Sequence, residues 1–316
     1  MNNEKIVISV ILVIGKMRDR AKKALNSVLE QENISTAEVL VVDTCDESFP
    51  PIMEKNDLVK YIRGPKGMGI GELKELAIQQ AEGYWVAFIE EHVRAFPGWI
   101  NAILKLDRKY DGMGGEVHNL NAGERFSTPL HYCNYYRWLP GAPGRESELI
   151  AGHNSVYHRE VLLGLGEKIA NFIQHEFLLS NYIKQRSGKL LFNPDFKLGH
   201  INESGLYEIT RAYFYWHKCA GAALPVNQNW KYLRLIVYVA LSSIKPFYKT
   251  AKIFFFLITN NPRRLFEFTI NSPWIFYIHA VACSGLVAGR LFELKNAKHI
   301  LVEVELDADR TNIPNL

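Results

Sequence analysis

Three adjacent polar residues, Glu90, Glu91 and His92, directly follow an apolar run of the sequence. That run, Trp85–Ile89, has the length of a strand buried in a parallel sheet. Carboxylates and imidazoles can bind a divalent metal, and open α/β sheets bind ligands beyond the carboxyl ends of their strands. The pattern favours a metal or ligand site, although a strand followed by a solvated loop would look the same.

Two more segments carry residues of chemical interest. Asp43 directly follows the predicted strand Glu38–Val42, where it could contact a ligand or cap a turn. The glycine-rich loop Gly67–Gly71 could lie against a diphosphate, but turn chemistry explains it equally well, since it lacks the Gly-Lys-Ser/Thr of a P-loop. Lys66 and Lys74 flank this loop and are candidate phosphate partners.

The elements that would position these residues alternate between strand and helix. Ile6–Ile14 is apolar and β-branched, which predicts a central buried strand and not a cleaved leader. Lys16–Gln31 has an apolar face with helical spacing. The same patterns predict strands at 38–42, 58–62 and 84–89 and helices at 72–81, 97–110 and 172–185. This alternation predicts an α/β fold with a right-handed, mostly parallel sheet flanked by helices.

Composition argues against nucleic-acid binding and against a disulfide-linked fold. The chain has 316 residues, 48% of them hydrophobic, and a net charge of +4, which is enough apolar content for a sizeable core. It has no dense basic block with interleaved aromatics, so we expect no nucleic-acid binding. The 4 cysteines are far apart, which predicts free thiols in a reducing compartment.

The last third of the chain is more apolar. Residues 235–244, 253–262 and 268–289 carry no charge, and the third stretch has the length of a membrane-spanning helix. Pro273 and His279 weaken that interpretation, and Lys and Arg residues between the stretches would suit interfacial helices on anionic lipid. A buried helical subdomain is the remaining alternative. We predict a catalytic domain at 1–225 and a helical, membrane-associating region at 226–316.

About the first 205 residues resemble a family 2 glycosyltransferase of the GT-A type. The resemblance rests on several short motifs in the family's order: Ile8-Ser9-Val10-Ile11, Ser27–Gln31, Glu38–Thr44, Leu73–Gly83, Glu90-Glu91-His92, Pro97-Gly98-Trp99 and His175–Leu179. It implies a Rossmann-like nucleotide-sugar-binding fold and transfer of a sugar, with inversion, from a nucleotide-diphospho-sugar to an acceptor hydroxyl.

The resemblance also implies roles for individual residues. Glu176 matches the family's general base, although an aspartate is usual there. Residues expected to bind the nucleotide sugar are Ser9, Asp43, Lys74, Glu90 and Glu91, and those expected to line the donor or acceptor pocket are His153, Asn154 and His175.

The expected metal ligands are His92, Glu91 and His200. His92 stands where the family usually has an aspartate, and an imidazole suits Mn²⁺ better than Mg²⁺. We therefore expect a divalent metal, Mn²⁺ or Mg²⁺, with the substitution at His92 leaving its identity open.

The sequence thus predicts a non-processive glycosyltransferase of cell-surface or lipid-linked glycan synthesis, because the Q-x-x-R-W motif of processive synthases is absent. We expect it on the cytoplasmic face of the membrane, either peripheral or held by one C-terminal helix. Thr44 and His92 depart from the family pattern, and they leave open a degenerate domain that binds a nucleotide sugar or a protein partner without turnover.

Overall fold

The computed structural model describes residues 6–65, 67–226, 232–292, 300, 302–303 and 306, with the side chains of 223–226, 232 and 235 left out. Lys66, a candidate phosphate partner, lies outside the described residues. The chain forms two compact units. Unit 1 consists of Met1–His118 and Trp138–His200, and unit 2 of Asn119–Arg137 and Ile201–Leu316. Residues 119–137 and 201–225 thus belong to the unit that contains the apolar last third, whereas the predicted division fell after residue 225.

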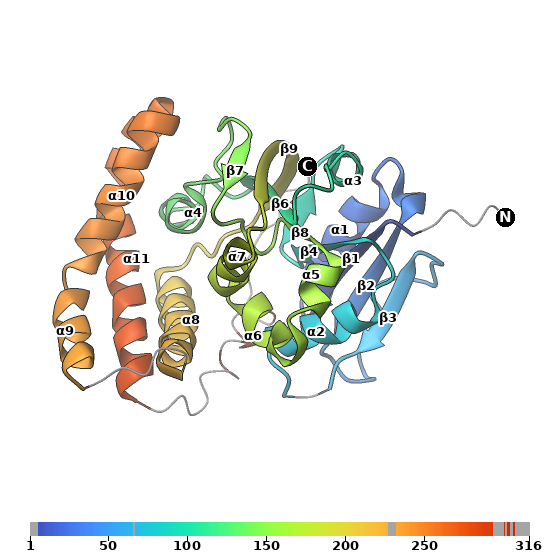
Figure 1. The fold of residues 1–316 in the computed structure, drawn as a ribbon, viewed down its shortest axis with the longest axis horizontal. Coiled ribbons are helices and arrows are strands. Elements are labelled where there is room, and N and C mark those ends of the chain that lie inside the picture. Colours follow the sequence, from blue (N-terminus) through green and yellow to red (C-terminus); the bar gives the residue numbers. More distant parts are fainter. Residues whose placement is uncertain are drawn as a thin grey trace. The chain divides into compact units, whose positions relative to one another are not determined.

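Unit 1 is built on a nine-stranded mixed sheet with the order β3-β2-β1-β4-β8-β6-β9-β5, in which β7 also pairs with β9 (Figure 1). The strands are β1 Ile8–Ile14, β2 Ala37–Asp43, β3 Val59–Arg63, β4 Trp85–Glu90, β5 Val93–Ala95, β6 Gly112–Asn119, β7 Arg145–Ser147, β8 Ser155–His158 and β9 Leu190–His200.

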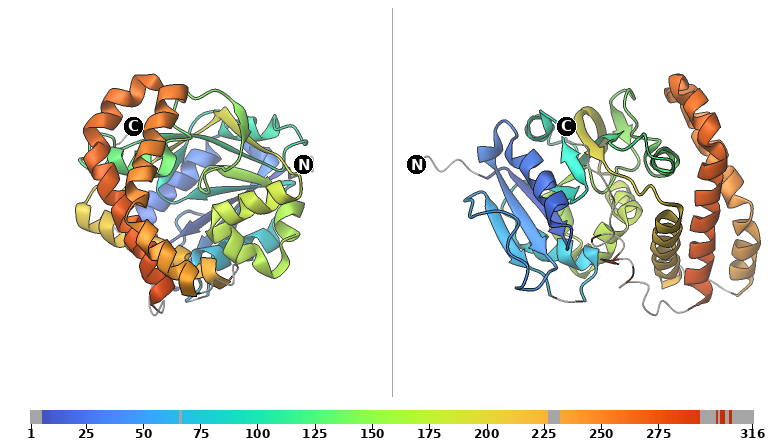
Figure 2. Two further views of the ribbon diagram at one scale, coloured as in Figure 1. Left: turned by 60° about the vertical axis from the view of Figure 1, so that its left-hand side comes forward. Right: turned by 180° about the vertical axis from the view of Figure 1, so that it is seen from behind.

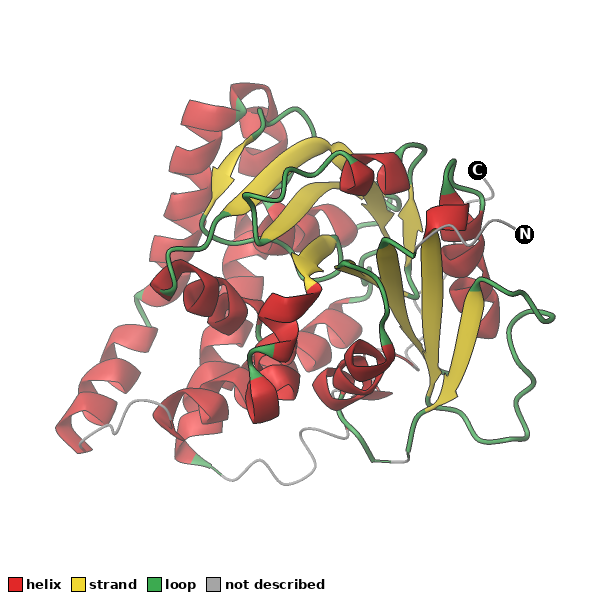
Figure 3. Cartoon of the chain, turned by 45° about the vertical axis from the view of Figure 1, so that its right-hand side comes forward, coloured by secondary structure: helices red, strands yellow, loops and turns green. Residues whose placement is uncertain are grey.

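The parallel part of the sheet consists of β3, β2, β1 and β4, which run side by side in Figure 3. β1 and β2 are buried along their whole length, as their apolar sequences predict. In the register, Ile14 pairs with Asp43 and Val13 with Glu90. Asp43 and Glu90 therefore end their strands at the same edge of the sheet.

The remaining strands pair antiparallel. β8 runs against β4, and the short β5 runs against β9 with Val93 opposite His200. Because β5 follows β4 after a two-residue turn, this pairing returns the end of β9 to the end of β4. The antiparallel half of the sheet thereby places His200 beside the Glu90–His92 segment.

Helices flank this sheet in unit 1: α1 Arg18–Leu29, α2 Ile70–Gln80, α3 Trp99–Leu104, α5 Arg159–Leu163, α6 Ile169–Gln174 and α7 Glu176–Gln185, with 3-10 turns at Ile34–Thr36 and Gly166–Lys168. The helix predicted over 172–185 is interrupted at His175, whose backbone angles (φ −127°, ψ 85°) are not helical. A Cβ at Gly71 would lie 2.1 Å from the Ala170 carbonyl oxygen, so this glycine permits the close packing of α2 on α6.

Unit 2 is helical in its described residues. Its helices are α4 Ser127–Tyr135, α8 Leu206–Val226, α9 Tyr232–Ser242, α10 Lys245–Asn260 and α11 Leu265–Leu291, with a 3-10 turn at Pro262–Arg264. α11 packs against α8 and α10, and these three lie side by side in Figure 2. Pro262–Leu291 is long and apolar enough to cross a membrane, a property that buried core helices share.

Candidate functional site

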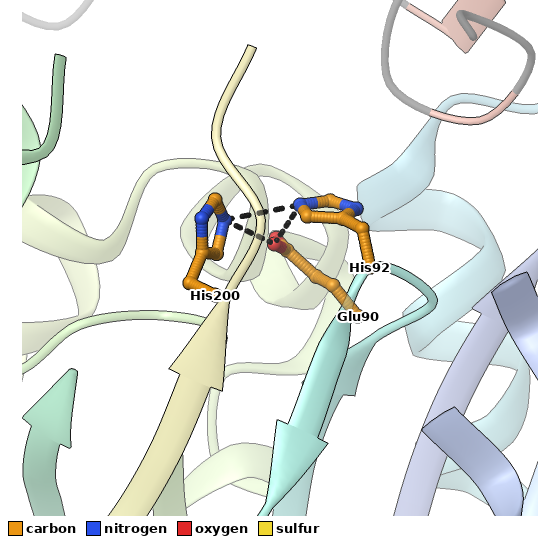
Figure 4. Close-up of side chains that lie close together, drawn as sticks. All are labelled: Glu90, His92 and His200. Atoms are coloured by element: carbon orange, nitrogen blue, oxygen red, sulfur yellow. Dashed lines mark hydrogen bonds and ion pairs between the residues drawn. The ribbon is translucent and has the colours of Figure 1, made fainter. Parts of the chain in front are cut away.

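The end of β4 and the end of β9 bring three potential metal ligands together in unit 1. The Nε2 atom of His92 lies 3.0 Å from Oε2 of Glu90 and 3.1 Å from Nε2 of His200. Figure 4 shows the carboxylate and both rings pointing toward one another. All three potential ligand atoms lie within 4.8 Å of one another, and we call Glu90, His92 and His200 the ligand group.

Charge in the ligand group favours cation binding. Burial works to raise the pKa of Glu90, but hydrogen bonds from His200 and His92 hold it well below its ordinary value. The carboxylate is therefore ionised at neutral pH. The ring of His153 lies 4.8 Å from the ring of His200, so a third imidazole adjoins the group. One carboxylate and two imidazoles form a donor set that Mn²⁺ accepts, and the residues fit a divalent metal.

Glu91 is not part of this group. Its carboxylate forms a buried ion pair with Arg20 of α1 and accepts a hydrogen bond of 2.9 Å from the backbone N–H of Gly15. Glu91 and His92 form the two-residue turn between β4 and β5, in which the Glu91 carboxylate pairs with Arg20 while the His92 ring faces Glu90 and His200. Metal binding by Glu91 stays a prediction that this placement does not favour. Glu90, which was predicted to bind the nucleotide sugar, is the carboxylate that lies beside His92 and His200.

Glu176, the predicted base, is the first residue of α7. Burial raises its pKa to about 7, nearby Lys74 acts to lower it, and Glu90 acts to raise it. A Cβ on Gly152 would lie 2.1 Å from Oε1 of Glu176, so a larger residue there would displace this carboxylate. A carboxyl group with a pKa near 7 can accept a proton from a hydroxyl and later release it.

Two of the other predicted residues lie beside Glu176. Lys74 of α2 is buried, and its Nζ atom lies 5.7 Å from the centre of the Phe88 ring. His175 precedes Glu176 at the break between α6 and α7, and burial lowers its pKa to about 4. His175 is therefore neutral at pH 7 and adds no charge to the carboxylate next to it.

Asn154 has a structural position. Its side chain accepts a hydrogen bond of 3.0 Å from Nε1 of Trp99 and donates to the backbone carbonyls of Glu116 and Phe196, each at 3.0 Å. The residue is fully buried. Asn154 thus joins α3, β6 and β9, and its predicted place in the pocket is not favoured by these bonds.

Asp43 lies at the end of β2 in a dense cationic setting. Arg18 donates to both carboxylate oxygens, at 3.0 and 2.9 Å, and Arg63 donates to Oδ2 at 2.8 Å. Tyr61 donates to the same oxygen, and burial together with this bond raises the pKa of Tyr61 to about 12. A nucleotide approaching Asp43 would meet these cationic side chains as well as the carboxylate.

Ser9 lies near the other end of β1 from this edge. Its hydroxyl donates to Glu38 at 2.6 Å and accepts from the backbone N–H of Gly83 at 2.8 Å. The structure does not bring Ser9 to the ends of β1, β2 and β4. Its role in binding the nucleotide sugar stays a prediction.

Sequence reasoning missed the partners of the two buried carboxylates. These are Arg18, Tyr61 and Arg63 around Asp43, and Arg20 beside Glu91. Two signals were present in the sequence. Arg63 ends the strand next to β2, in register with Asp43. Arg18 and Arg20 occupy the first turn of the helix that follows β1, on the side where strand ends meet.

Residues 9–165 match the family model described as glycosyl transferase family 2. No curated protein sequence matches the chain significantly.

Two solved structures have a similar fold. One is GalNAc-T7 with UDP, GalNAc and Mn²⁺, with a TM-score of 0.50 and 18% sequence identity. The alignment covers 73% of this chain and 52% of that one, so this chain spans about half the length of GalNAc-T7. The other is the mannosyltransferase PcManGT from Pyrobaculum calidifontis in complex with GDP-Man and Mn²⁺, with a TM-score of 0.50 and 14% identity over 89% of this chain and 85% of that one.

The motifs at the strand ends, the mixed sheet and the family match all lead to one assignment, which confirms the expectation from the sequence. Through residues 9–165, the chain belongs to glycosyl transferase family 2, a family of glycosyltransferases, and its fold is of the GT-A type.

Proposed function

We propose that the protein transfers a single sugar from a nucleotide-diphospho-sugar to an acceptor hydroxyl with inversion at the anomeric carbon. The observation that carries this proposal is Glu176, a carboxyl group with a pKa of about 7 near the ligand group. A one-step displacement needs a base on the acceptor side only, and one carboxylate of this kind meets that need. The absence of the Q-x-x-R-W motif supports addition of one sugar per encounter.

In the proposed reaction Glu176 takes the proton of the acceptor hydroxyl as its oxygen bonds to the anomeric carbon. The bond from that carbon to the diphosphate breaks, and its electron pair leaves with the diphosphate. Lys74 opposes the effect of burial on Glu176 and keeps part of the carboxyl group ionised at neutral pH. Gly152 leaves room for the carboxylate and donates its backbone N–H to it.

A divalent cation would be held by Glu90, His92 and His200, with His153 adjoining. When bound, such a cation would neutralise charge on the departing diphosphate. Both similar structures contain Mn²⁺, which supports Mn²⁺ as the first metal to test. At the end of β2, Asp43 with Arg18 and Arg63 is suited to the nucleotide end of the donor, where the guanidinium groups can meet acceptor atoms.

We further propose a glycan or lipid-linked acceptor at the cytoplasmic face of a membrane. The support is the apolar character of the helices of unit 2, α9, α10 and α11. A nucleic-acid partner is not expected, since the chain's net charge is only +4.

The proposal can be tested with the purified full chain, a panel of UDP- and GDP-sugars, Mn²⁺ and glycan acceptors. Released nucleoside diphosphate measures turnover, and NMR of the product gives the anomeric configuration. Glu176→Gln should lower acceptor-dependent turnover by about 10²–10⁴-fold, the usual contribution of a general base. Glu148→Gln is the matched control, because that side chain is 79% exposed and pairs only with Lys184 among the described residues.

Retention of configuration, or a Glu176→Gln variant as active as the wild type, would reject the mechanism. If donors bind but wild type and variant share the same negligible turnover, the alternative of a degenerate domain that binds nucleotide sugar without transfer would replace it.

A further inference from the structure

Exposed apolar side chains gather on unit 2. On α10, Phe247, Tyr248 and Phe255 are each 64% exposed, and on α9 Leu233 is 72% and Leu241 51% exposed. In the described part of unit 1, by contrast, Leu104 at 36% is the only large hydrophobic residue classed as exposed. Clusters of exposed apolar side chains are typical of contact with another molecule or a lipid phase.

The exposed residues of α10 follow helical spacing. Phe247, Ala251, Phe255 and Ile258 recur every three or four residues and so lie along one side of the helix. On the other side Pro246, Ile253 and Leu257 are buried within unit 2. α10 is therefore apolar on both its inner and its outer side. We call the outer side, with the exposed residues of α9, the α9–α10 face.

Cations border this face. The Nζ atom of Lys245 lies 3.2 Å from the centre of the Tyr238 ring, and the guanidinium carbon of Arg290 lies 3.8 Å from the same centre. Lys249 follows Lys245 by one helical turn. Burial, with the nearby charges of Arg290 and Lys249, holds the pKa of Lys245 below its ordinary value, although Cys283 acts in the opposite direction. Among the described residues, no acidic side chain forms an ion pair with Lys245 or Lys249.

The dimensions of the helices argue against a membrane crossing at this face. A crossing needs about 20 apolar residues. α9 has 11 residues and α10 has 16, and α10 also carries Lys249 and Lys252.

α11, with 27 residues, is long enough to cross, but it is tightly packed on α8. A Cβ at Gly289 would lie 1.9 Å from the carbonyl oxygen of Lys218, and one at Gly285 2.4 Å from that of Phe214. α8 carries Lys218 and Arg211, and Arg211 forms an ion pair with Glu303 near the end of the chain. A crossing α11 would draw these charges into the hydrocarbon region, where they are costly.

We propose that unit 2 docks on an anionic lipid bilayer through the α9–α10 face and that α11 does not cross it. Phe247, Tyr248 and Phe255 enter the boundary between head groups and acyl chains, and Lys245, Lys249 and Arg290 meet lipid phosphates. Aromatic side chains flanked by cations are the composition that interfacial helices use. The inference refines the membrane location of the proposed function, and it is measured without a sugar donor, so its failure leaves the transfer reaction untouched.

Binding of the full chain to vesicles tests the cations. The wild type should sediment with vesicles of phosphatidylcholine and phosphatidylglycerol and bind more weakly to phosphatidylcholine alone. The triple variant Lys245→Gln, Lys249→Gln, Arg290→Gln should bind the mixed vesicles roughly 100-fold more weakly, given the usual contribution of each cation near an anionic surface. The control Lys22→Gln, Lys23→Gln, Lys105→Gln removes the same charge from exposed positions of unit 1 and should bind like the wild type.

Since Lys249 and Arg290 are partly buried, a second variant guards against misfolding. Phe247→Gln with Phe255→Gln changes exposed side chains only, and it should also weaken binding to mixed vesicles while circular dichroism stays unchanged.

The position of α11 is tested with a C-terminal tag on protein added to preformed vesicles. A reagent that cannot cross the bilayer should label the tag and unit 1 equally.

Three results would overturn the inference. They are binding that is equal for the wild type and both variants, a tag that is protected while unit 1 is labelled, and a lipid-free dimer that Phe247→Gln with Phe255→Gln dissociates. The last would assign the face to a second copy of the chain.

Discussion

The two units differ in which side chains they shield from water and which they expose. Unit 1 buries polar groups: Asp43, Glu91, His92 and Asn154 are almost inaccessible, and each is held by hydrogen bonds or ion pairs. Unit 2 exposes apolar groups, among them Phe247, Phe255 and Phe266. Burying a polar group is costly unless it is paired, and exposed apolar patches are typical of contact with another molecule or a lipid phase. The contrast is consistent with the proposed chemistry in unit 1 and the proposed docking through unit 2.

The largest expected effect concerns the ligand group. Replacing His92 and His200 by alanine should lower metal-stimulated transfer by roughly 10³-fold, because a divalent cation contributes several kcal/mol to the transition state. Calorimetric titration with Mn²⁺ should show the matching loss of affinity, and vesicle binding should not change. His118→Ala is a control, since its partner is Glu116 outside the ligand group. Full activity of the double variant would show that transfer does not depend on the ligand group.

The next effect tests the buried polar framework. Asn154→Ala removes three hydrogen bonds and leaves buried partners unsatisfied, so it should lower the free energy of unfolding of unit 1 by about 3 kcal/mol. Urea denaturation followed by tryptophan fluorescence measures the change. The exposed Asn171→Ala should leave the midpoint in place. Equal urea midpoints for the two variants would contradict the structural role assigned to Asn154.

A smaller change is expected in the pH profile. The rate of transfer should rise about tenfold per pH unit below pH 7 and level off above it, because only ionised Glu176 accepts a proton. Lys74→Met removes a charge that lowers the pKa of Glu176, so the rise should move to higher pH. Initial rates at saturating donor and acceptor measure both curves. A profile that Lys74→Met leaves unmoved, or moves to lower pH, would contradict the assignment of the base.

The smallest effect should come from the apolar face of unit 2. Phe247→Gln with Phe255→Gln should change the free energy of unfolding in water by no more than about 0.5 kcal/mol, because both rings are exposed. The buried Phe196 of unit 1 offers the contrast, since its replacement by alanine should cost about 4 kcal/mol. Comparable losses at both places would show that the α9–α10 face packs against protein.

Sequence patterns predicted the parallel half of the sheet and most of the ligand group. The buried strands Ile8–Ile14 and Ala37–Asp43 are marked by continuous apolar runs, which local sequence reveals. The return of β9 to β5 depends on a pairing between residues more than 100 positions apart, and no local pattern encodes it. His200 was expected at the metal through the family resemblance alone.

The choice between Glu90 and Glu91 was less secure, because two adjacent carboxylates look equivalent in a sequence. They are distinguished only by the turn that follows β4, in which Glu91 pairs with Arg20 and Glu90 stays beside His92 and His200. The break at His175 was also missed, since 172–185 keeps helical periodicity across it. The partners of Asp43 come from three separate elements, and only the assembled sheet brings them together.

The orientation of Glu91 has an evolutionary consequence. Its ion pair with Arg20 and its bond to the Gly15 N–H fix the turn that carries the two residues on either side of it. Under the proposed function, the attachment of the turn and the binding of the metal depend on different, neighbouring residues. The residue at position 92 can then change from an oxygen to a nitrogen donor while the scaffold keeps its shape, so metal preference becomes a trait that one codon can alter.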